Sequence, residues 1–285
     1  MFAGASNSFS KLIDSIADGT RPGTSFGTSV TPAQNSYGSY AQLLSGANVT
    51  DDVWAISLCV NSVNVAGASR NVIITVGYDP AGGTSYTDTD QHLLVGPAGA
   101  YSGAASNGGP VWFYLPRRLR AGTSIGLKGS VNSADLTAFS AYAQLWCRPR
   151  RPELARAGAY VDTLGATTAS SSGTAVTPGT TSDGSWTQIG TLTRSAWYLA
   201  WGVGVDDSTM SNNVGHVDIS IGDASNKRIV VSNGYFFTAA NEAIGKPAQG
   251  AFVRGSAGDV VYARMQVGPN AADSNYSVAV YAVGG

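Results

Sequence analysis

Gly27-Thr28-Ser29-Val30-Thr31-Pro32, followed after five residues by Gly38-Ser39-Tyr40-Ala41-Gln42-Leu43, is the stretch that decides the fold. Both phrases return 146 positions later, as Gly173-Thr174-Ala175-Val176-Thr177-Pro178 and Gly184-Ser185-Trp186-Thr187-Gln188-Ile189. A common register across two six-residue blocks indicates an internal duplication, and a duplication has to be recognised before the fold is assigned. The sequence therefore predicts two copies of one module.

Weaker similarities extend the duplication along the chain. Ile74-Thr75-Val76-Gly77 resembles Ile219-Ser220-Ile221-Gly222 at an offset of 145, and Phe139-Ser140-Ala141 resembles Tyr276-Ser277-Val278 at an offset of 137. The falling offset indicates shorter loops in the second copy. Much of the extra length in the first copy falls in residues 98–109, whose Gly, Ala and Ser content is typical of a loop tip that accepts insertions.

Composition limits the class of protein. The 285 residues leave room for two domains, and charged residues make up only 12%, against about 25% in typical globular proteins. Low charge with 36 glycines favours an all-β protein with many tight turns. A net charge of -1 gives no general attraction to nucleic acid or membrane. No secretory leader and no apolar run of membrane-spanning length is visible, so we expect neither membrane nor nucleic acid as a partner.

Short β-branched and aromatic stretches, separated by Gly, Asn and Asp turns, recur through both copies. The clearest candidates are 54–60, 71–78, 111–115 and 137–147 in the first copy and 186–192, 197–205, 217–221, 260–267 and 276–283 in the second. This pattern predicts two tandem antiparallel β-sandwiches with jelly-roll-like or Greek-key topology. An immunoglobulin-like sandwich is the alternative, although it usually has about seven strands in about 100 residues. We place the modules at 27–148 and 159–285, joined by an Arg/Pro linker at 149–158.

Residues 1–26 lie outside this repeat and form a predicted N-terminal arm. Phe9, Leu12, Ile13 and Ile16 have the spacing of one helical face, so we expect a short helix at 8–17. Such a helix is marginal in isolation and needs a partner for its apolar face. It would either fold back on its own module or dock on a neighbouring subunit.

The region around the linker is basic. Between Arg117 and Arg156 there are eight Lys or Arg residues and two acidic residues. Arg148, Arg150 and Arg151 would belong either to a solvated, rigid linker or to a patch that meets an acidic neighbour. Nucleic acid is the weaker partner because the segment lacks interleaved aromatic residues.

No motif points to catalysis, a metal or a cofactor. Ser124 lies in a G-x-S-x-G match, but a glycine turn precedes it and a predicted strand follows, whereas a nucleophile elbow needs a strand before and a helix after. His92 and His216 lie near aspartates without a recognisable ligand set. Cys59 and Cys147 are too few for a disulfide framework, so buried free thiols are expected. The sequence thus predicts a protein that is not an enzyme and has no cofactor or bound metal.

Five aromatic residues lie near Gly-rich loops: Tyr37, Tyr40, Tyr86, Tyr101 and Trp186. Aromatic side chains in such places either stack on sugars or serve in cores and protein interfaces. If a glycan is bound, Tyr101 and Trp186 are the expected contacts.

The chain resembles structural proteins of tailed bacteriophages. The resemblance is carried by Gly27-Thr28-Ser29-Val30-Thr31-Pro32, by the segment from Tyr37 to Leu44, and by Asp79-Pro80-Ala81-Gly82-Gly83-Thr84-Ser85-Tyr86. It implies a non-enzymatic virion component in many copies, used as head decoration or as a neck, tail or fibre fitting, and assembled in the host cytoplasm.

Under this resemblance the partners are other virion proteins and further copies of the same chain. The arm residues Phe9, Leu12, Ile13 and Ile16, together with Arg148, Arg150 and Arg151, are then the expected assembly interface. The alternative is a carbohydrate-binding receptor module that attaches to a glycan on the host surface.

Overall fold

The computed structural model describes residues 9–14, 27–61, 71–97, 111–131, 138–150, 156–171, 173–205, 213–238, 250–268 and 276–285. The protein is all-β: these residues form strands, turns and one short 3-10 turn, η2 (Gly46–Asn48), and none of them lies in an α-helix. The expected all-β class is therefore confirmed, whereas the expected helical arm is wrong.

Module 1 consists of two sheets. The first sheet has the order β1-β10-β5-β8, with β2 also paired to β10; its strands are β1 (Phe9–Asp14), β2 (Thr28–Val30), β5 (Val53–Asn61), β8 (Val111–Leu115) and β10 (Phe139–Pro149). The second has the order β3-β9-β6-β7, with β4 also paired to β9; its strands are β3 (Ala33–Gln34), β4 (Ala41–Leu44), β6 (Asn71–Asp79), β7 (Thr87–Pro97) and β9 (Ser124–Val131).

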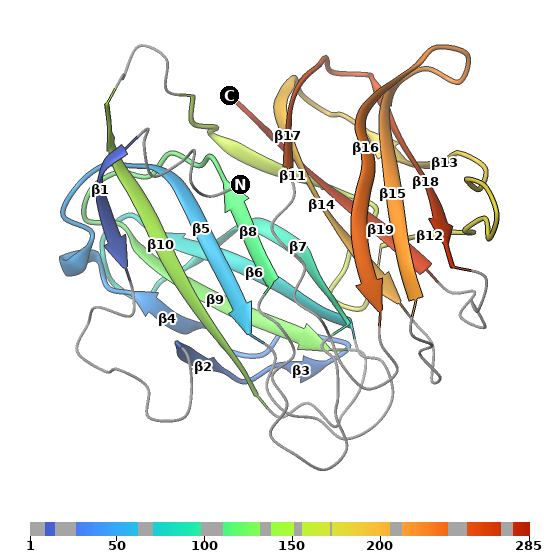
Figure 1. The fold of residues 1–285 in the computed structure, drawn as a ribbon. Helices are drawn as coiled ribbons and strands as arrows, with labels where there is room; N and C mark the ends of the chain where they lie inside the picture. Colours follow the sequence, from blue (N-terminus) through green and yellow to red (C-terminus); the bar gives the residue numbers. More distant parts are fainter. Residues whose placement is uncertain are drawn as a thin grey trace.

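Module 2 repeats this arrangement. Its first sheet has the order β11-β19-β14-β17, with β12 also paired to β19; the strands are β11 (Tyr160–Leu164), β12 (Thr174–Val176), β14 (Ala196–Val205), β17 (Gly250–Gly255) and β19 (Tyr276–Gly284). Its second sheet has the order β13-β18-β15-β16; the strands are β13 (Thr187–Thr191), β15 (Asn213–Gly222), β16 (Lys227–Thr238) and β18 (Val260–Val267). Figure 1 shows module 1 in blue to green and module 2 in yellow to red.

Each of the nine described strands of module 2 has a counterpart in module 1, and the tenth strand of module 1, β3, is represented in module 2 by a single bridge. The pairing of β3 with β9 is parallel, whereas the other strand pairs are antiparallel. Module 2 has a parallel bridge between Gly179 and Gln266 at the corresponding place on β18. By the same correspondence β1 is the counterpart of β11. In each module the last strand pairs with two strands from the beginning of the module, first β1 or β11 and then the shorter β2 or β12. Residues 9–14 therefore complete module 1 and do not lie outside the repeat.

Backbone geometry explains why the repeated phrase begins with glycine. Gly27 and Gly173 have φ angles of 98° and 100°, a region that glycine enters without steric penalty. A Cβ atom at Gly27 would lie 2.4 Å from the carbonyl oxygen of Ala141, and one at Gly173 would lie 2.7 Å from that of Val278. In both modules the chain therefore comes so close to the last strand that a side chain does not fit.

The N-terminal segment is a strand because the edge of β10 is available to pair with it. β1 runs antiparallel to β10, with Phe9 opposite Pro149 and Asp14 opposite Gln144, and this pairing satisfies backbone groups that an isolated short helix would have to satisfy alone. The side chain of Phe9 lies 6.0 Å from the Trp146 ring, measured between ring centroids. Leu12 is 44% exposed on the other side of the strand, and Ile16 lies outside the described residues.

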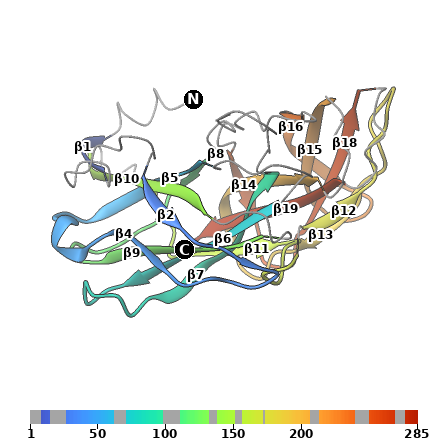
Figure 2. The ribbon, with the colours of Figure 1, turned by 90° about the horizontal axis from the view of Figure 1, so that it is seen from below.

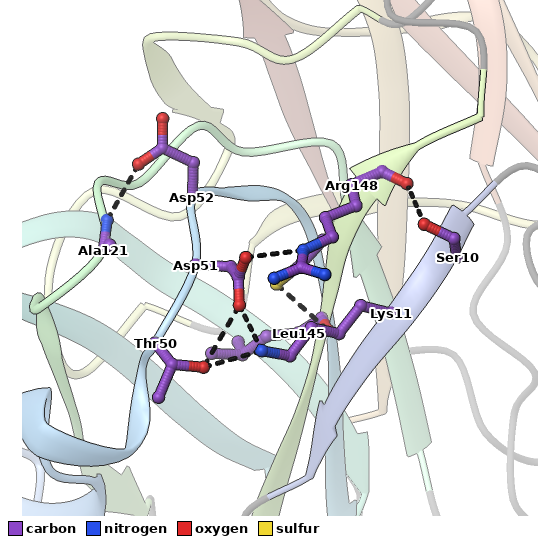
Figure 3. Close-up of polar contacts among 9 residues, drawn as sticks. Ser10, Lys11, Thr50, Asp51, Asp52, Ala121, Leu145 and Arg148 are labelled. Carbon is purple, nitrogen blue, oxygen red and sulfur yellow. Dashed lines mark hydrogen bonds and ion pairs between the residues drawn. The ribbon is translucent and has the colours of Figure 1, made fainter.

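Ionic contacts attach β1 to its own module (Figure 3). Lys11 forms an ion pair with Asp51, which also accepts a hydrogen bond of 2.7 Å from Nε of Arg148. The Ser10 hydroxyl donates to the carbonyl of Arg148 over 3.0 Å. The hydrogen bond from Lys11, followed by that from Arg148, lowers the pKa of Asp51 to about 2.

Two of the three arginines expected at an assembly interface therefore have partners within the chain. Arg148 pairs with Asp51, and Nε of Arg150 donates to the carbonyl of Phe9 over 3.5 Å. Arg151 lies outside the described residues. Ile13, also expected at that interface, is partly buried and packs against the module 1 core.

Each module has a hydrophobic core, and that of module 1 extends across the junction into module 2. The core of module 1 continues onto one face of β14 and β19, where Tyr198, Tyr281 and Val283 are buried. The amide of Leu94 on β7 donates to the hydroxyl of Tyr281 over 2.5 Å. All nine residues of β19 are buried, as expected for a strand covered on both faces. The views in Figures 1 and 2 both show β7 beside the first sheet of module 2.

A buried polar network lies at this junction. Arg117 forms an ion pair with Asp90 at 3.3 Å, and the hydroxyl of Tyr78 donates to the same carboxylate over 2.5 Å. Nη1 of Arg117 also donates to the carbonyls of Gly158 and Ala159, which open module 2. Arg117 therefore has its partners inside the chain, whereas the sequence allowed its basic segment to be either a solvated linker or a patch for an acidic neighbour.

The cysteines are buried and form no disulfide. Cys59 lies opposite Tyr142 and Cys147 opposite Val53, so the backbone positions of the two cysteines are about 17 Å apart along the β5–β10 pair. Within the described ranges, no helix has the length and apolar character needed to cross a membrane.

Candidate functional site

An aromatic surface covers the outer face of the second sheet of module 1. Along β6 and β9, Val76 and Leu127 point into the core, so Gly77 and Gly126 face outward by strand alternation. A Cβ atom at Gly77 would lie 2.4 Å from the hydroxyl of Tyr40, and one at Gly126 would lie 2.8 Å from the ring of Tyr86. The two tyrosines therefore lie against the sheet where glycine leaves room, with ring centroids 4.8 Å apart.

Charged groups adjoin these rings. Nζ of Lys128 lies 2.8 Å from Asp88 and 4.8 Å from the centroid of Tyr40, and 5.1 Å from that of Tyr37, within the range of cation–π attraction. The Tyr40 hydroxyl donates to Asp88. Although burial acts in the opposite direction, the hydrogen bonds from Lys128 and Tyr40 lower the pKa of Asp88.

His92 completes this surface and has an unusual backbone. Its φ angle is 55°, and it lies where the register of β6 and β7 shifts between Ile74 and Val76. Its Nδ1 lies 2.7 Å from the hydroxyl of Tyr37, and burial lowers its pKa. Bulges and strained residues are concentrated at functional sites, where they redirect side chains. We call Tyr37, Tyr40, Tyr86, Asp88, His92 and Lys128 the tyrosine face.

Module 2 carries a related surface at the equivalent place. Trp186 follows Gly184-Ser185 as Tyr40 follows Gly38-Ser39, and the guanidinium of Arg264 lies 4.6 Å from its ring centroid. The repeated phrase fixes the correspondence of β9 with β18, which makes Lys128 and Arg264 equivalent.

Strand register corrects one part of the repeat. Lys128 pairs with Thr75, and Arg264 pairs with Asp218, so Thr75 corresponds to Asp218. The sequence offset of 145 matched Thr75 with Ser220, two residues further on. The structural match brings a carboxylate opposite Arg264.

Hydrogen bonds hold Arg264 in place. Asp218, 4% exposed, accepts from Nε over 3.0 Å and from Nη2 over 2.8 Å, while Asp183 lies 2.7 Å from Nη2. Nε2 of His216 donates to the other oxygen of Asp183 over 2.9 Å. We call Trp186, Asp183, His216, Asp218 and Arg264 the tryptophan face.

Each face lies beside a bulge, and the two bulges are at equivalent places in the modules. Asn233 on β16 has a φ angle of 53° at a register shift between Val217 and Ile219, and its amide donates to Asp218 over 2.8 Å. In module 1 the amide of His92 donates to the hydroxyl of Thr75 over 3.4 Å. Two non-glycine residues with positive φ at matching places indicate a feature that the module fold itself maintains.

The residues singled out from the sequence have mixed outcomes. Tyr37, Tyr40 and Tyr86 come together on one face, and Trp186 lies on the other, whereas Tyr101 falls outside the described residues. The hydroxyl of Ser124 donates to the carbonyl of Gly83 over 2.5 Å in a turn.

The charged partners, Lys128 and Arg264 above all, were not recognised as site residues. In the sequence, Ala121-Gly122 resembles Ala257-Gly258 at an offset of 136, which also relates Lys128 to Arg264 as equivalent positions but does not mark either as a site residue.

Both faces offer aromatic rings with hydrogen-bond donors and acceptors beside them. Their cations are paired with carboxylates, so neither face is strongly charged. In the part of the chain that the structure describes, no group of three or more His, Cys, Asp or Glu side chains is placed to hold a metal ion.

Comparison with known proteins gives distant structural matches. No family model and no curated protein matches the sequence. A peptide-N(4)-(N-acetyl-β-D-glucosaminyl) asparagine amidase aligns over 96% of both chains at 10% identity with a TM-score of 0.39. PNGase F, a glycosylasparaginase from Flavobacterium meningosepticum, aligns over 96% of both at 11% identity and 0.35. The tandem CBM22 domains of Paenibacillus barcinonensis Xyn10C align over 86% of this chain and 83% of theirs, at 13% identity and 0.21.

These matches contradict the expectation that the chain is not an enzyme, since two of these three proteins are named as enzymes. At TM-scores below 0.5 they nevertheless assign no reaction, substrate or ligand to this chain. None of the three is a phage protein, and the place in a tailed-phage virion stays a prediction.

Proposed function

We propose that this protein binds carbohydrate and that the tyrosine face of module 1 is a binding site. The observation that carries the proposal is the placement of Tyr40 and Tyr86 against Gly77 and Gly126 on the outer face of a sheet. Aromatic rings fixed in this way lose little conformational entropy when a flat, apolar surface stacks on them. The apolar face of a sugar ring is such a surface.

The polar groups beside the rings match the remainder of a sugar. Lys128 and Asp88 supply a donor and an acceptor that are already held in place by their ion pair, and Asp88 is 38% exposed. His92 adds a ring nitrogen next to Tyr37. Hydroxyl groups both donate and accept, so a surface with both kinds of partner suits carbohydrate better than it suits a purely anionic or purely apolar ligand.

A glycan array followed by calorimetric titration of the best oligosaccharide tests this proposal. We expect Tyr40→Ala to weaken binding at the tyrosine face at least tenfold and Tyr40→Phe, which keeps the ring, to weaken it much less. Tyr160→Ala is the matched control, because Tyr160 is also a tyrosine under a cation, Arg194 at 4.6 Å, but belongs to neither face. An array without any bound glycan, or a titration of Tyr40→Ala with the affinity and the number of sites of the wild type, would overturn the proposal.

We also infer that each module is a jelly roll. The order β2-β10-β5-β8 in one sheet and β4-β9-β6-β7 in the other is the order that eight strands take in two Greek keys, and module 2 repeats it. An experimental structure that places β5 beside a strand other than β8 and β10 would contradict this topology.

The setting that the sequence resemblance implies is a tailed-phage virion, where a glycan site would face the host surface. Mass spectrometry of purified particles would detect this chain if it is a virion component.

A further inference from the structure

The tryptophan face contains a buried carboxylate that fixes an arginine beneath an aromatic ring. Asp218 is 4% exposed and takes three hydrogen bonds, two from Arg264 and one from the amide of Asn233. Burying a carboxylate is costly unless it is paired and hydrogen-bonded, as it is here. The result is a guanidinium held in one orientation 4.6 Å from the ring centroid of Trp186.

Further polar and aromatic groups extend this surface along the sheet. His216 pairs with Gln266 on β18 and with Tyr235 on β16, so the three side chains share the outer face in one row. Tyr235 is 54% exposed, and the side chains of His216 and Arg264 are 27% and 26% exposed. A ligand lying along the sheet would meet these groups together with Trp186.

Charge narrows the chemical class of that ligand. Arg264 lies between Asp183 and Asp218, with oxygen distances of 2.7 Å and 2.8 Å. Its positive charge is therefore already compensated, and an anionic ligand would meet two carboxylates. A neutral ligand rich in hydroxyl groups can accept from Arg264 and donate to Asp183 without that repulsion.

We propose that the tryptophan face is a second carbohydrate site, specific for neutral sugars, so that one chain binds two glycans. This inference rests on the proposed function of the tyrosine face and on the equivalence of the two faces. The equivalence is detailed: each face has an aromatic residue after Gly-Ser, a cation at the matching position of β9 or β18, and a bulge with a φ angle near 55°.

Calorimetry with a neutral oligosaccharide selected on the array tests the number of sites. We expect two sites per chain in the wild type, one in Trp186→Ala, one in Tyr40→Ala and none in the double variant. The Tyr160→Ala control keeps two. Trp186→Phe and Arg264→Lys are milder changes for use if Trp186→Ala does not fold.

Binding at the tryptophan face can also be followed in the wild-type protein by NMR spectroscopy. The indole N–H signal of Trp186, assigned through its loss in Trp186→Phe, is expected to shift on titration of the wild type with the same oligosaccharide. One site per chain, lost in Tyr40→Ala and with an unmoved Trp186 signal, would overturn the second site and leave the first. A single site that is lost only in Trp186→Ala would overturn the site on the tyrosine face and support the site on the tryptophan face. No binding at all would overturn both.

Discussion

The junction network makes a quantitative prediction for Arg117→Ala. The Arg117 side chain is 10% exposed and that of Asp90 is fully buried, with 3.3 Å between Nε and the carboxylate. Removing the guanidinium leaves Asp90 with the hydroxyl of Tyr78 as its remaining described partner. It also removes the side-chain donor to the carbonyls of Gly158 and Ala159, of which Gly158 keeps its backbone hydrogen bond from the amide of Arg118. Breaking a buried ion pair in this one-sided way costs about 3–5 kcal/mol.

That loss corresponds to a fall in Tm of roughly 6–20 °C, taking about 2–4 °C per kcal/mol for a protein of this size. Differential scanning calorimetry at pH 7 measures it. The matched control is Arg118→Ala in the adjacent residue, where the ion pair to Asp52 is 2.7 Å long but the side chains are 38% and 46% exposed. An exposed pair of this kind is worth about 1 kcal/mol or less.

The comparison of the two variants decides the matter. If Arg117→Ala and Arg118→Ala lower the Tm by similar amounts, the junction network does not hold the modules together and the reasoning fails. Protonation of Asp90 would relieve its unpaired charge, so the loss in Arg117→Ala is also expected to shrink as the pH falls towards 4.

Three further predictions concern backbone geometry and pH. Gly27→Ala should lower the Tm more than Gly122→Ala, because both have positive φ but only the new Cβ at position 27 meets a carbonyl, that of Ala141; equal shifts in thermal denaturation would contradict this. Burial raises the folded pKa of Asp90, so its stabilisation is complete below its ordinary pKa of 3.8 and is lost as the pH rises through the folded value. The free energy of unfolding of the wild type minus that of Asp90→Asn, measured by urea titration, should therefore be largest near pH 4 and decrease as the pH rises. The pKa of Asp51 is lowered to about 2, so its contribution should be present above pH 3.8 and disappear as the pH falls to 2, a change that Asp51→Asn should lack in the same titrations.

The sequence by itself determined the class of the fold and its duplication. Alternation and turn residues are local signals, and the apolar run from Val278 to Val283 in β19 is typical of a strand that is buried on both faces. The repeated phrase also reflects a structural requirement. Its glycines at 27 and 173 are needed because the backbone comes close to the last strand of each module.

The tertiary structure alone decided the state of the N-terminal segment and the composition of the faces. The spacing of Phe9, Leu12 and Ile13 fits a helix equally well, and only the open edge of β10 makes the segment a strand. Likewise, Lys128 and Arg264 are ordinary basic residues in the sequence. They become site residues because strand register brings each of them beside an aromatic side chain from a distant part of the chain, and register depends on pairing partners that no local pattern specifies.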